Sequence, residues 1–386
     1  MSKTDKDIVI VGGGPVGLYL AGRLLQQGFS CSVLEKKPEI DRHSKSLGIH
    51  PISLELFQKA GIVDDFLNHG INIEKGIAFW NREKTGEITF EKCPGPFRFI
   101  LALPQWQTEK ILQDWVQALS PETVVRNAEV TGIRQQKNSV HVTFSQDEKE
   151  ETVRAKFVVG CDGKNSAVRR SVGIRFDGDP YPDKYIMGDF TDNTDFGKHA
   201  AVFLHSSGLI ESFPLPGGFR RWVVKTDKRI EQPDKQILAG IVNDRIGHPL
   251  FDAENVMMSS FGVEHFLART MNCGRVLLAG DAAHVVSPIG GQGMNLGWMG
   301  AELCSITLKK AQQNPGFHQR LFDVYTSKLS AIAKQTARRA EINMWLGRAE
   351  NSGKAVQLAV RLMTKPPASH LLARLFTMRG LGRWWV

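Results

Sequence analysis

Glycines spaced for phosphate binding stand near the start of the chain. Residues 8–17 read IVIVGGGPVG, which places Gly12, Gly14 and Gly17 in a G-x-G-x-x-G pattern. The first glycine allows a tight turn, the second lets the backbone approach a pyrophosphate, and the third lets a helix pack close to a strand. Free N–H groups at the N-terminus of that helix favour the phosphate charge. The pattern predicts a dinucleotide site without distinguishing FAD from NAD.

The elements around these glycines form one βαβ unit. Residues 7–12 are short, β-branched and end in glycine, which predicts a buried parallel strand. Apolar residues at helical spacing predict a helix over 15–28, and 31–35 predict a second strand. Glu35 ends that strand, where a carboxylate can accept hydrogen bonds from ribose hydroxyls.

Two further motifs follow predicted strands later in the chain. Asp162-Gly163 comes directly after the apolar run at 157–160, and Gly280-Asp281 ends the run at 275–280. A carboxylate at the C-terminal end of a parallel strand can reach a ligand. The second motif leads through more glycines into a helix predicted over 293–311, which offers a further set of backbone N–H groups.

Taken together, the three motifs resemble those of class A flavoprotein monooxygenases, the p-hydroxybenzoate hydroxylase-like aromatic hydroxylases, with their quinone-precursor and tetracycline-inactivating branches. The resemblance covers roughly residues 7–310. It implies bound FAD, NADPH or NADH as co-substrate, and O2. It also implies a reduced flavin that forms a C4a-hydroperoxide and passes one oxygen atom to an aromatic or polyketide-like molecule, tetracycline-type antibiotics included.

The resemblance also assigns the cofactor contacts. Glycines of the first motif would hold the FAD pyrophosphate, Glu35 the ribose and Asp281 the ribityl chain or nearby ribose, while Pro288 would lie near the reactive face of the flavin. No residue is assigned as catalytic base. Where the family commonly has an arginine before the helix that starts near Pro51, this chain has Lys45, which cannot form a bidentate fork. The full set of expected cofactor residues is Gly12, Gly14, Pro15, Val16, Gly17, Glu35, Lys36, Arg42, Gln105, Asp162, Gly163, Gly280, Asp281, Pro288, Gly290, Gly291, Gln292, Gly293, Met294 and Asn295.

The predicted architecture is α/β, with a Rossmann-like FAD-binding domain, an inserted antiparallel substrate sheet and a C-terminal helical segment. The FAD-binding domain is expected to be discontinuous, at 1–75, 101–178 and 270–315. The sheet domain takes 76–100 and 179–269, where aromatic, strand-like runs alternate with Gly and Pro, and the helices take 316–386.

The sequence indicates the residues that bind the substrate less clearly. Four aromatic residues are weak candidates for pocket walls, because aromatic clefts suit aromatic ligands, and ordinary sheet core is an equal alternative. These four are Phe79, Phe203, Phe213 and Trp222. Several side chains could deprotonate a phenol, but a structural role is expected for each of His199, His205, Tyr181, Tyr185 and His284.

Composition excludes some functions. The net charge is +9, but six of the basic residues lie in 353–386 without any acid, so the body is nearly balanced and a nucleic-acid partner is not expected. The five dispersed cysteines favour neither disulfides nor a metal site. With no secretory or membrane-spanning segment, a cytoplasmic monomer or homodimer is expected.

The basic tail has two interpretations. It is amphipathic around 370–376 and carries Trp384-Trp385, so it could lie on the inner face of a membrane, where anionic lipid attracts Lys and Arg. It could instead form a helix that packs over the substrate entrance, which is the favoured interpretation.

Two other enzyme functions stay open: hydroxylation of a quinone or polyprenyl-phenol precursor, and an FAD-dependent reductase or oxidase of the same fold. A non-enzymatic FAD-binding regulator or scaffold is the remaining alternative.

Overall fold

The computed structural model describes residues 3–42, 46–346, 348 and 354–380. Its first large sheet is built around the N-terminal strand, which lies between two parallel neighbours and continues the order β17-β18-β11-β1-β2-β8. The apolar runs of the sequence form this buried centre, as expected for a parallel sheet. The strands are β1 (Lys3–Val11), β2 (Cys31–Leu34), β8 (Val124–Val125), β11 (Lys149–Gly160), β17 (Asn272–Cys273) and β18 (Val276–Leu278), with β9 (Ala128–Gln135) and β10 (Val140–Gln146) extending from β11.

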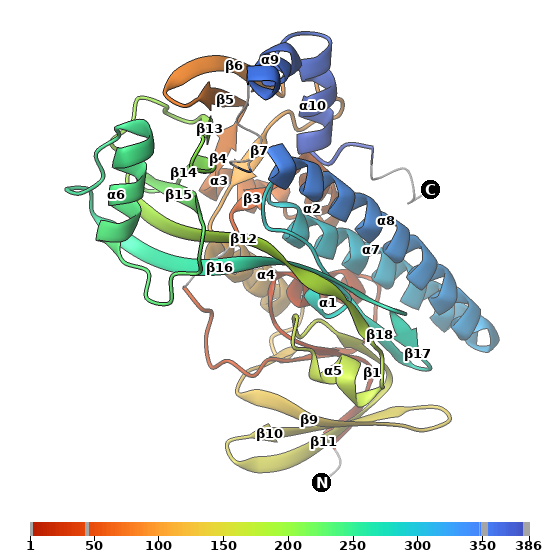
Figure 1. Ribbon diagram of the computed structural model, residues 1–386. Helices are drawn as coiled ribbons and strands as arrows, with labels where there is room; N and C mark the ends of the chain where they lie inside the picture. Colours follow the sequence, from red (N-terminus) through yellow and green to blue (C-terminus); the bar gives the residue numbers. More distant parts are fainter. Residues whose placement is uncertain (1–2, 43–45, 347, 349–353, 381–386) are drawn as a thin grey trace.

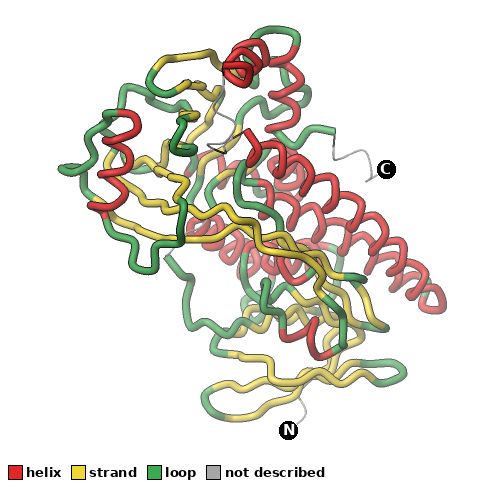
Figure 2. The backbone as a smooth tube through the Cα atoms, viewed as in Figure 1, coloured by secondary structure: helices red, strands yellow, loops and turns green. Residues whose placement is uncertain are grey.

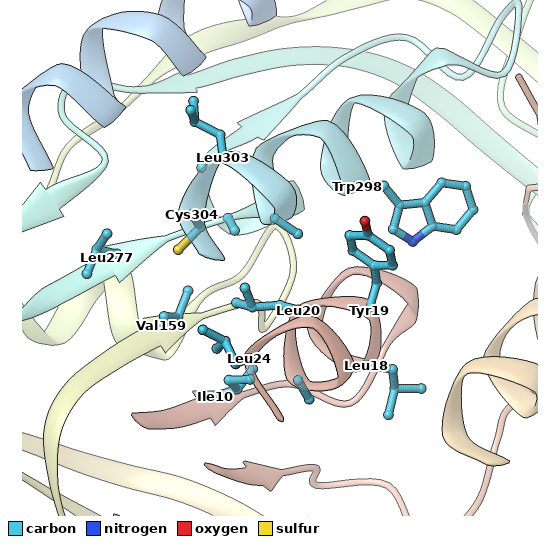
Figure 3. Close-up of a cluster of buried hydrophobic side chains, with 14 of the residues drawn as sticks. Ile10, Leu18, Tyr19, Leu20, Leu24, Val159, Leu277, Trp298, Leu303 and Cys304 are labelled. Carbon is cyan, nitrogen blue, oxygen red and sulfur yellow. The ribbon is translucent and has the colours of Figure 1, made fainter. Parts of the chain in front are cut away.

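Long helices pack on this sheet and on each other (Figures 1 and 2). Figure 3 shows the core they enclose, where Tyr19 and Trp298 lie between the first helix and α7. Tyr19 donates a hydrogen bond to Glu302 at 2.8 Å, and Arg23 pairs with the same carboxylate, so the buried polar atoms are satisfied. These helices are α1 (Pro15–Gln26), α4 (Gln105–Leu119), α7 (Gln292–Gln313) and α8 (His318–Leu346).

The second large sheet follows the order β19-β16-β12-β15-β14-β13-β5-β6 and is mostly antiparallel. Helix α6 (Lys235–Ile246) covers one face with an apolar cluster. The other face is turned toward the cofactor motifs described below. Its strands are β5 (Lys75–Trp80), β6 (Glu83–Thr89), β12 (Phe176–Thr191), β13 (Ala200–Leu204), β14 (Ile210–Leu215), β15 (Phe219–Thr226), β16 (Asn255–Ala268) and β19 (His284–Val285).

A three-stranded sheet contacts both β14 of the second large sheet and α7, and three short helices complete the fold. The small sheet has the order β3-β7-β4. Its strands are β3 (Gly48–Ile49), β4 (Ile71–Ile73) and β7 (Ile100–Ala102), and the helices are α2 (Pro51–Ala60), α3 (Val63–His69) and α5 (Ala167–Ser171).

The C-terminal helices return to the second sheet. Helices α9 (Lys354–Met363) and α10 (Ala368–Phe376) pack against β6, at the top of Figure 1. Arg379, just beyond α10, pairs with Glu55 of α2. No helix in the described part of the chain combines the length and apolar character needed to cross a membrane.

The predicted fold class is confirmed: the chain combines a largely parallel sheet with an inserted sheet and C-terminal helices. The second sheet begins at β5 and β12, within a few residues of the expected domain boundaries at 76 and 179. It also contains β19 at 284–285, inside the segment that was assigned to the FAD-binding domain. The chain therefore crosses back to the second sheet between the Gly280-Asp281 motif and α7.

Candidate active site

One cavity of about 710 Å³ joins the glycine loops of the first domain to the open face of the second sheet. Its walls come from loops near the start of α1, α5 and α7, from strands β5 and β12–β15, and from helices α9 and α10. The residues of the three motifs, about 270 positions apart along the sequence, therefore meet at one place.

The first motif has the geometry that its spacing predicts. Gly12 has φ +107°, and a Cβ on it would lie 2.4 Å from the Cys161 carbonyl oxygen. A Cβ on Gly17 would lie 2.0 Å from the Gly12 carbonyl oxygen. By contrast, a Cβ on Gly14 would meet no atom within 4 Å, and Gly14 lines the cavity as the N-cap of α1. Two glycines are thus required by backbone packing, and the third leaves open space for a ligand.

Glu35 supports this loop from behind. Its Oε2 accepts a hydrogen bond from the backbone N–H of Gly13 at 2.6 Å, and its Oε1 accepts one from the N–H of Lys37 at 2.9 Å. Lys36 and Arg42 are exposed and do not line the cavity; Arg42 lies over the Trp106 ring at 5.9 Å. Lys45 lies outside the described residues.

The two aspartate motifs reach the cavity in different ways. Asp281 is exposed and lines it, together with Gly163 and Gly280. One carboxylate oxygen of Asp162 accepts a hydrogen bond from the backbone N–H of Val168 at 3.1 Å, which helps to start α5. Its other oxygen, Oδ1, is buried without a partner in the described part of the chain.

The glycine loop before α7 contributes most of its predicted residues to the cavity. Those that line it are Pro288, Gly290, Gly291, Gly293 and Met294. Asn295 does not: its Oδ1 accepts hydrogen bonds from His50 N at 2.8 Å and Ser53 Oγ at 2.7 Å, and its Nδ2 donates to Gly48 O and Gly291 O. The prediction that Asn295 contacts the cofactor is therefore corrected to a role in holding the loop against the start of α2.

His50 was not singled out by the sequence, yet it faces the same loop. Its Nε2 donates a hydrogen bond to the Gly290 carbonyl oxygen at 3.0 Å, since that oxygen can only accept. Burial lowers the pKa of His50 to about 4, so the ring is neutral at neutral pH. Its Nδ1 is then an acceptor that is buried without a hydrogen-bond partner among described residues.

These features fit a flavin dinucleotide. Buried polar atoms without a partner are rare in proteins, and three occur in loops that border the cavity: His50 Nδ1, Asp162 Oδ1 and Gln292 Oε1. The open Gly14 position and the N-terminus of α1 suit a pyrophosphate. Gln105, at the start of α4, lines the cavity and donates to Glu109 at 2.8 Å.

The sheet side of the cavity differs from the prediction. Of the four aromatic candidates, Phe213 lines the cavity. The expectation is wrong for the other three, because Phe79, Phe203 and Trp222 lie in the apolar cluster beneath α6. The reason is the two-residue period of a strand: Arg221 and Val223 face the cavity, so Trp222 between them faces the opposite side.

The cavity face carries two charged residues that the sequence reasoning missed. Arg221 donates two hydrogen bonds to the Asp189 carboxylate, at 2.6 and 2.7 Å. Glu211 of β14 lines the cavity, and burial raises its pKa to about 7. The run Ile210–Leu215 carries one acid among mostly apolar residues, which indicates a charged position on a strand. The sequence did not show which face of the sheet Glu211 would occupy.

The expected structural roles of the histidines and tyrosines agree with their positions. None of His199, His205, Tyr181, Tyr185 and His284 lines the cavity. Tyr181 donates to Glu341 at 2.7 Å, and His284 is buried with its pKa lowered by burial to about 4. Among described residues, no group of three His, Cys, Asp or Glu side chains could hold a metal ion.

Comparison with known proteins defines the family. A family model described as "FAD binding domain" matches residues 5–340. Rifampicin monooxygenase of Streptomyces venezuelae is 30% identical over 379 residues, covering 93% of this chain and 75% of that protein. Pentachlorophenol 4-monooxygenase of Sphingobium chlorophenolicum is 27% identical, covering 86% of this chain and 63% of that protein.

Solved structures show the same arrangement. The anhydrotetracycline hydroxylase OxyS from Streptomyces rimosus superposes with a TM-score of 0.81 at 26% identity, covering 97% of this chain and 76% of that one. The p-nitrophenol 4-monooxygenase PnpA from Pseudomonas putida gives a TM-score of 0.87 at 20% identity over 98% and 99% of the two chains, which shows a shared fold.

The chain belongs to the FAD binding domain family and, within it, to the class A FAD-dependent aromatic monooxygenases. The resemblance drawn from the three motifs is thereby confirmed.

Proposed function

We propose that this enzyme uses FAD and NADPH or NADH to insert one oxygen atom from O2 into an aromatic or polyketide-like substrate, with tetracycline-type antibiotics among the candidates. The observation that carries the proposal is the continuous cavity between the glycine loops and the apolar sheet face. Its size and lining suit an aromatic ligand held beside a flavin ring. Relatives named for rifampicin, pentachlorophenol and anhydrotetracycline support this substrate range.

When bound and reduced, FAD would supply the activated oxygen, through the C4a-hydroperoxide that the resemblance implies. The residues of the chain would perform the remaining tasks. Backbone groups at Gly14 and the start of α1 would hold the pyrophosphate, and the loop from Pro288 to Met294 would border the flavin ring. Apolar side chains of the sheet, α9 and α10 would exclude water from the reacting atoms.

The C-terminal helices support the interpretation that the tail covers the substrate site. Four of their residues line the cavity, Val360, Met363, Leu372 and Phe376, together with Thr364 just after α9. Because these two short helices pack against β6, the edge strand of the second sheet, this wall is the proposed route for substrate entry. Contact of the tail with a membrane stays a prediction.

The decisive experiment is a screen of the flavin-loaded enzyme for substrate-stimulated NAD(P)H oxidation with phenols, quinone precursors, tetracyclines and rifampicin. We expect a product heavier by one oxygen atom, with the label present when the reaction runs under ¹⁸O2. Stimulated oxidation of NAD(P)H that gives an unlabelled product, or full turnover without oxygen, would instead indicate a reductase or oxidase.

A further inference from the structure

A glutamate stands on the sheet side of the cavity, away from every cofactor motif. Glu211 of β14 pairs with Val202 of β13 and with Val223 of β15, and all three line the cavity. Residues paired across neighbouring strands share a face. The three side chains therefore form a strip across the sheet, with a carboxyl group between two aliphatic neighbours.

The other acids near this strip are already paired. Asp189 receives both hydrogen bonds from Arg221, and Asp183 pairs with Arg348 at 2.9 Å. Glu211 has no hydrogen bond or ion pair with any residue in the described part of the chain. Glu211 is half-buried and faces an apolar cavity, where a carboxylate without a hydrogen-bond donor costs free energy, so a ligand that donates a hydrogen bond would complete the site.

The charged groups around Glu211 are paired with one another, so burial governs the pKa of Glu211. On the neighbouring strands, the titratable groups are Tyr185 and the paired residues Arg221, Asp189, Lys225 and Asp183. From the cofactor side the cavity is lined by neutral His50, by Cys161 and by Asp281, whereas the described side chains of α9 and α10 add no charge to it. Burial raises the pKa of Glu211 to about 7, which is the range in which a general base works best at neutral pH.

The surrounding side chains indicate which donor fits. Phe213 and Phe261 line the same cavity, and Met187 and Leu209 add apolar surface. Aromatic and aliphatic walls suit an aromatic ring. A neutral hydroxyl on that ring suits the position better than an ammonium group, because moving a cation into an apolar cavity costs more desolvation free energy.

We propose that Glu211 recognises a phenolic hydroxyl of the substrate and acts as its catalytic base. This inference rests on the proposed monooxygenase function and specifies its substrate class as hydroxylated aromatics. The carboxylate accepts the phenolic O–H, that bond breaks as a carboxyl O–H bond forms, and the ring gains electron density as a phenolate. When the oxygenated ring carbon gives up its hydrogen as a proton to water and the ring becomes aromatic again, the proton held by Glu211 returns to the phenolate oxygen. O2 is the oxidant, NAD(P)H supplies the two electrons that reduce the second oxygen atom to water, and Glu211 ends each cycle as it began.

The first test measures binding to the oxidised, FAD-loaded enzyme. The probes are 4-methylphenol and 4-methylanisole, in which a methyl group replaces the hydroxyl hydrogen that Glu211 would accept, measured at about pH 8, where Glu211 is ionised and the phenol keeps its proton. We expect the unmodified enzyme to bind the phenol at least about tenfold more tightly than the ether, as one hydrogen bond to a charged group allows, and Glu211→Leu to bring that ratio close to one. Equal affinities for the two probes in the unmodified enzyme would overturn the proposal.

The second test measures turnover of the best phenol from the screen, with FAD absorbance and melting temperature confirming that each variant is folded. Glu211→Gln keeps the shape and a hydrogen-bond acceptor but cannot take the proton. We expect kcat to fall by about 10²–10⁴-fold, the usual contribution of a general base. The rise of kcat/KM with pH through about 7 in the unmodified enzyme is expected to vanish in this variant. The matched control is Glu254→Gln, the same change at an exposed position of the same sheet domain, which should leave every value unchanged.

The outcomes separate this inference from the proposed function. If the unmodified enzyme yields labelled product and Glu211→Gln keeps both its kcat and its pH profile, the role of Glu211 is refuted while the monooxygenase function stands. If no hydroxylated aromatic gives labelled product, the proposed function fails and the inference fails with it. A loss of activity that Glu211→Asp partly restores would support the base.

Discussion

The two sides of the cavity are built by different means. On the cofactor side, backbone atoms shape the wall: glycines at 12, 14 and 17 and again at 290–293 bring main-chain groups to the surface. On the substrate side, side chains shape the wall, from one face of a sheet and from two helices near the C-terminus. A backbone wall tolerates almost no substitution, whereas a side-chain wall can change its lining while the sheet stays intact. The comparison teaches that cofactor binding and substrate choice can be altered separately in this protein.

The largest effect is expected at Gly17. A Cβ there would lie 2.0 Å from the Gly12 carbonyl oxygen, and neither backbone segment can move without shifting β1 or α1. We expect Gly17→Ala to lose bound FAD and to destabilise the fold by roughly 3 kcal/mol or more, in the range of strong overpacking. Flavin absorbance and thermal melting measure both effects.

Gly14→Ala is the matched control for this prediction, because its Cβ meets open space. It should keep the melting temperature of the FAD-free protein while weakening FAD binding. If Gly17→Ala bound FAD as well as the unmodified chain, the view of the cofactor side as a rigid backbone wall would be wrong.

The next effect concerns the helical wall. Removing residues 353–386 takes away α9 and α10, which line the cavity and pack on β6. We expect the truncated protein to keep FAD but to raise KM by about tenfold or more and to consume NAD(P)H without forming product, because water reaches the reacting atoms. Comparing oxygenated product with NAD(P)H consumed measures this loss.

A separate outcome bears on the membrane interpretation of the tail. If the truncated protein kept normal turnover but no longer sedimented with anionic vesicles, the tail would be a membrane anchor instead of a cavity wall. Unchanged turnover and unchanged partitioning together would contradict both interpretations.

A pH-dependent effect on stability is expected at Glu211. Its pKa is 4.5 in an ordinary setting and about 7 in the fold, so the folded form keeps a proton that the unfolded form loses between these values. The stabilisation is therefore complete below about pH 4.5 and is lost as pH rises through 7. We expect Glu211→Gln to be more stable than the unmodified protein at pH 8.5, by on the order of 1–3 kcal/mol, with the difference shrinking toward pH 5. Melting temperatures across this range test the prediction, and a constant difference would contradict it.

The smallest effect is expected from a pair of substitutions on opposite faces of the second sheet. Phe213 faces the cavity, and Phe203 packs beneath α6 against Phe79 with ring centroids 4.5 Å apart. We expect Phe203→Leu to lower stability by about 1 kcal/mol without changing KM, since it repacks the core. Phe213→Leu should change KM or the oxygenated position severalfold while leaving the melting temperature nearly unchanged. Parallel kinetics and melts measure the pair, and the reverse pattern would show that the faces are misassigned.

Local sequence was sufficient to predict the cofactor side. A glycine motif, the strand before it and the helix after it lie within about 20 residues, and the requirement for Gly12 and Gly17 comes from the turn itself. Asp281 and most of the loop from Pro288 to Met294 also line the cavity, and their contact with the cofactor stays a prediction. Asn295 is the exception, because its hydrogen bonds connect the loop to a helix about 245 positions away, a contact that no local pattern contains.

Only the tertiary structure determined which residues form the substrate side of the cavity. Both faces of the second sheet are largely apolar, so alternation along β15 could not tell whether Trp222 or its neighbours Arg221 and Val223 would meet the substrate. Only the packing of α6 on one face and of α9 and α10 near the other determined which of these residues meet the cavity. The sequence by itself determined that this protein has a dinucleotide site, since phosphate recognition is a property of a short backbone segment, and the three motifs together indicated a flavin through their resemblance to one family. Which side chains meet the substrate, Glu211 among them, depended on how distant elements pack.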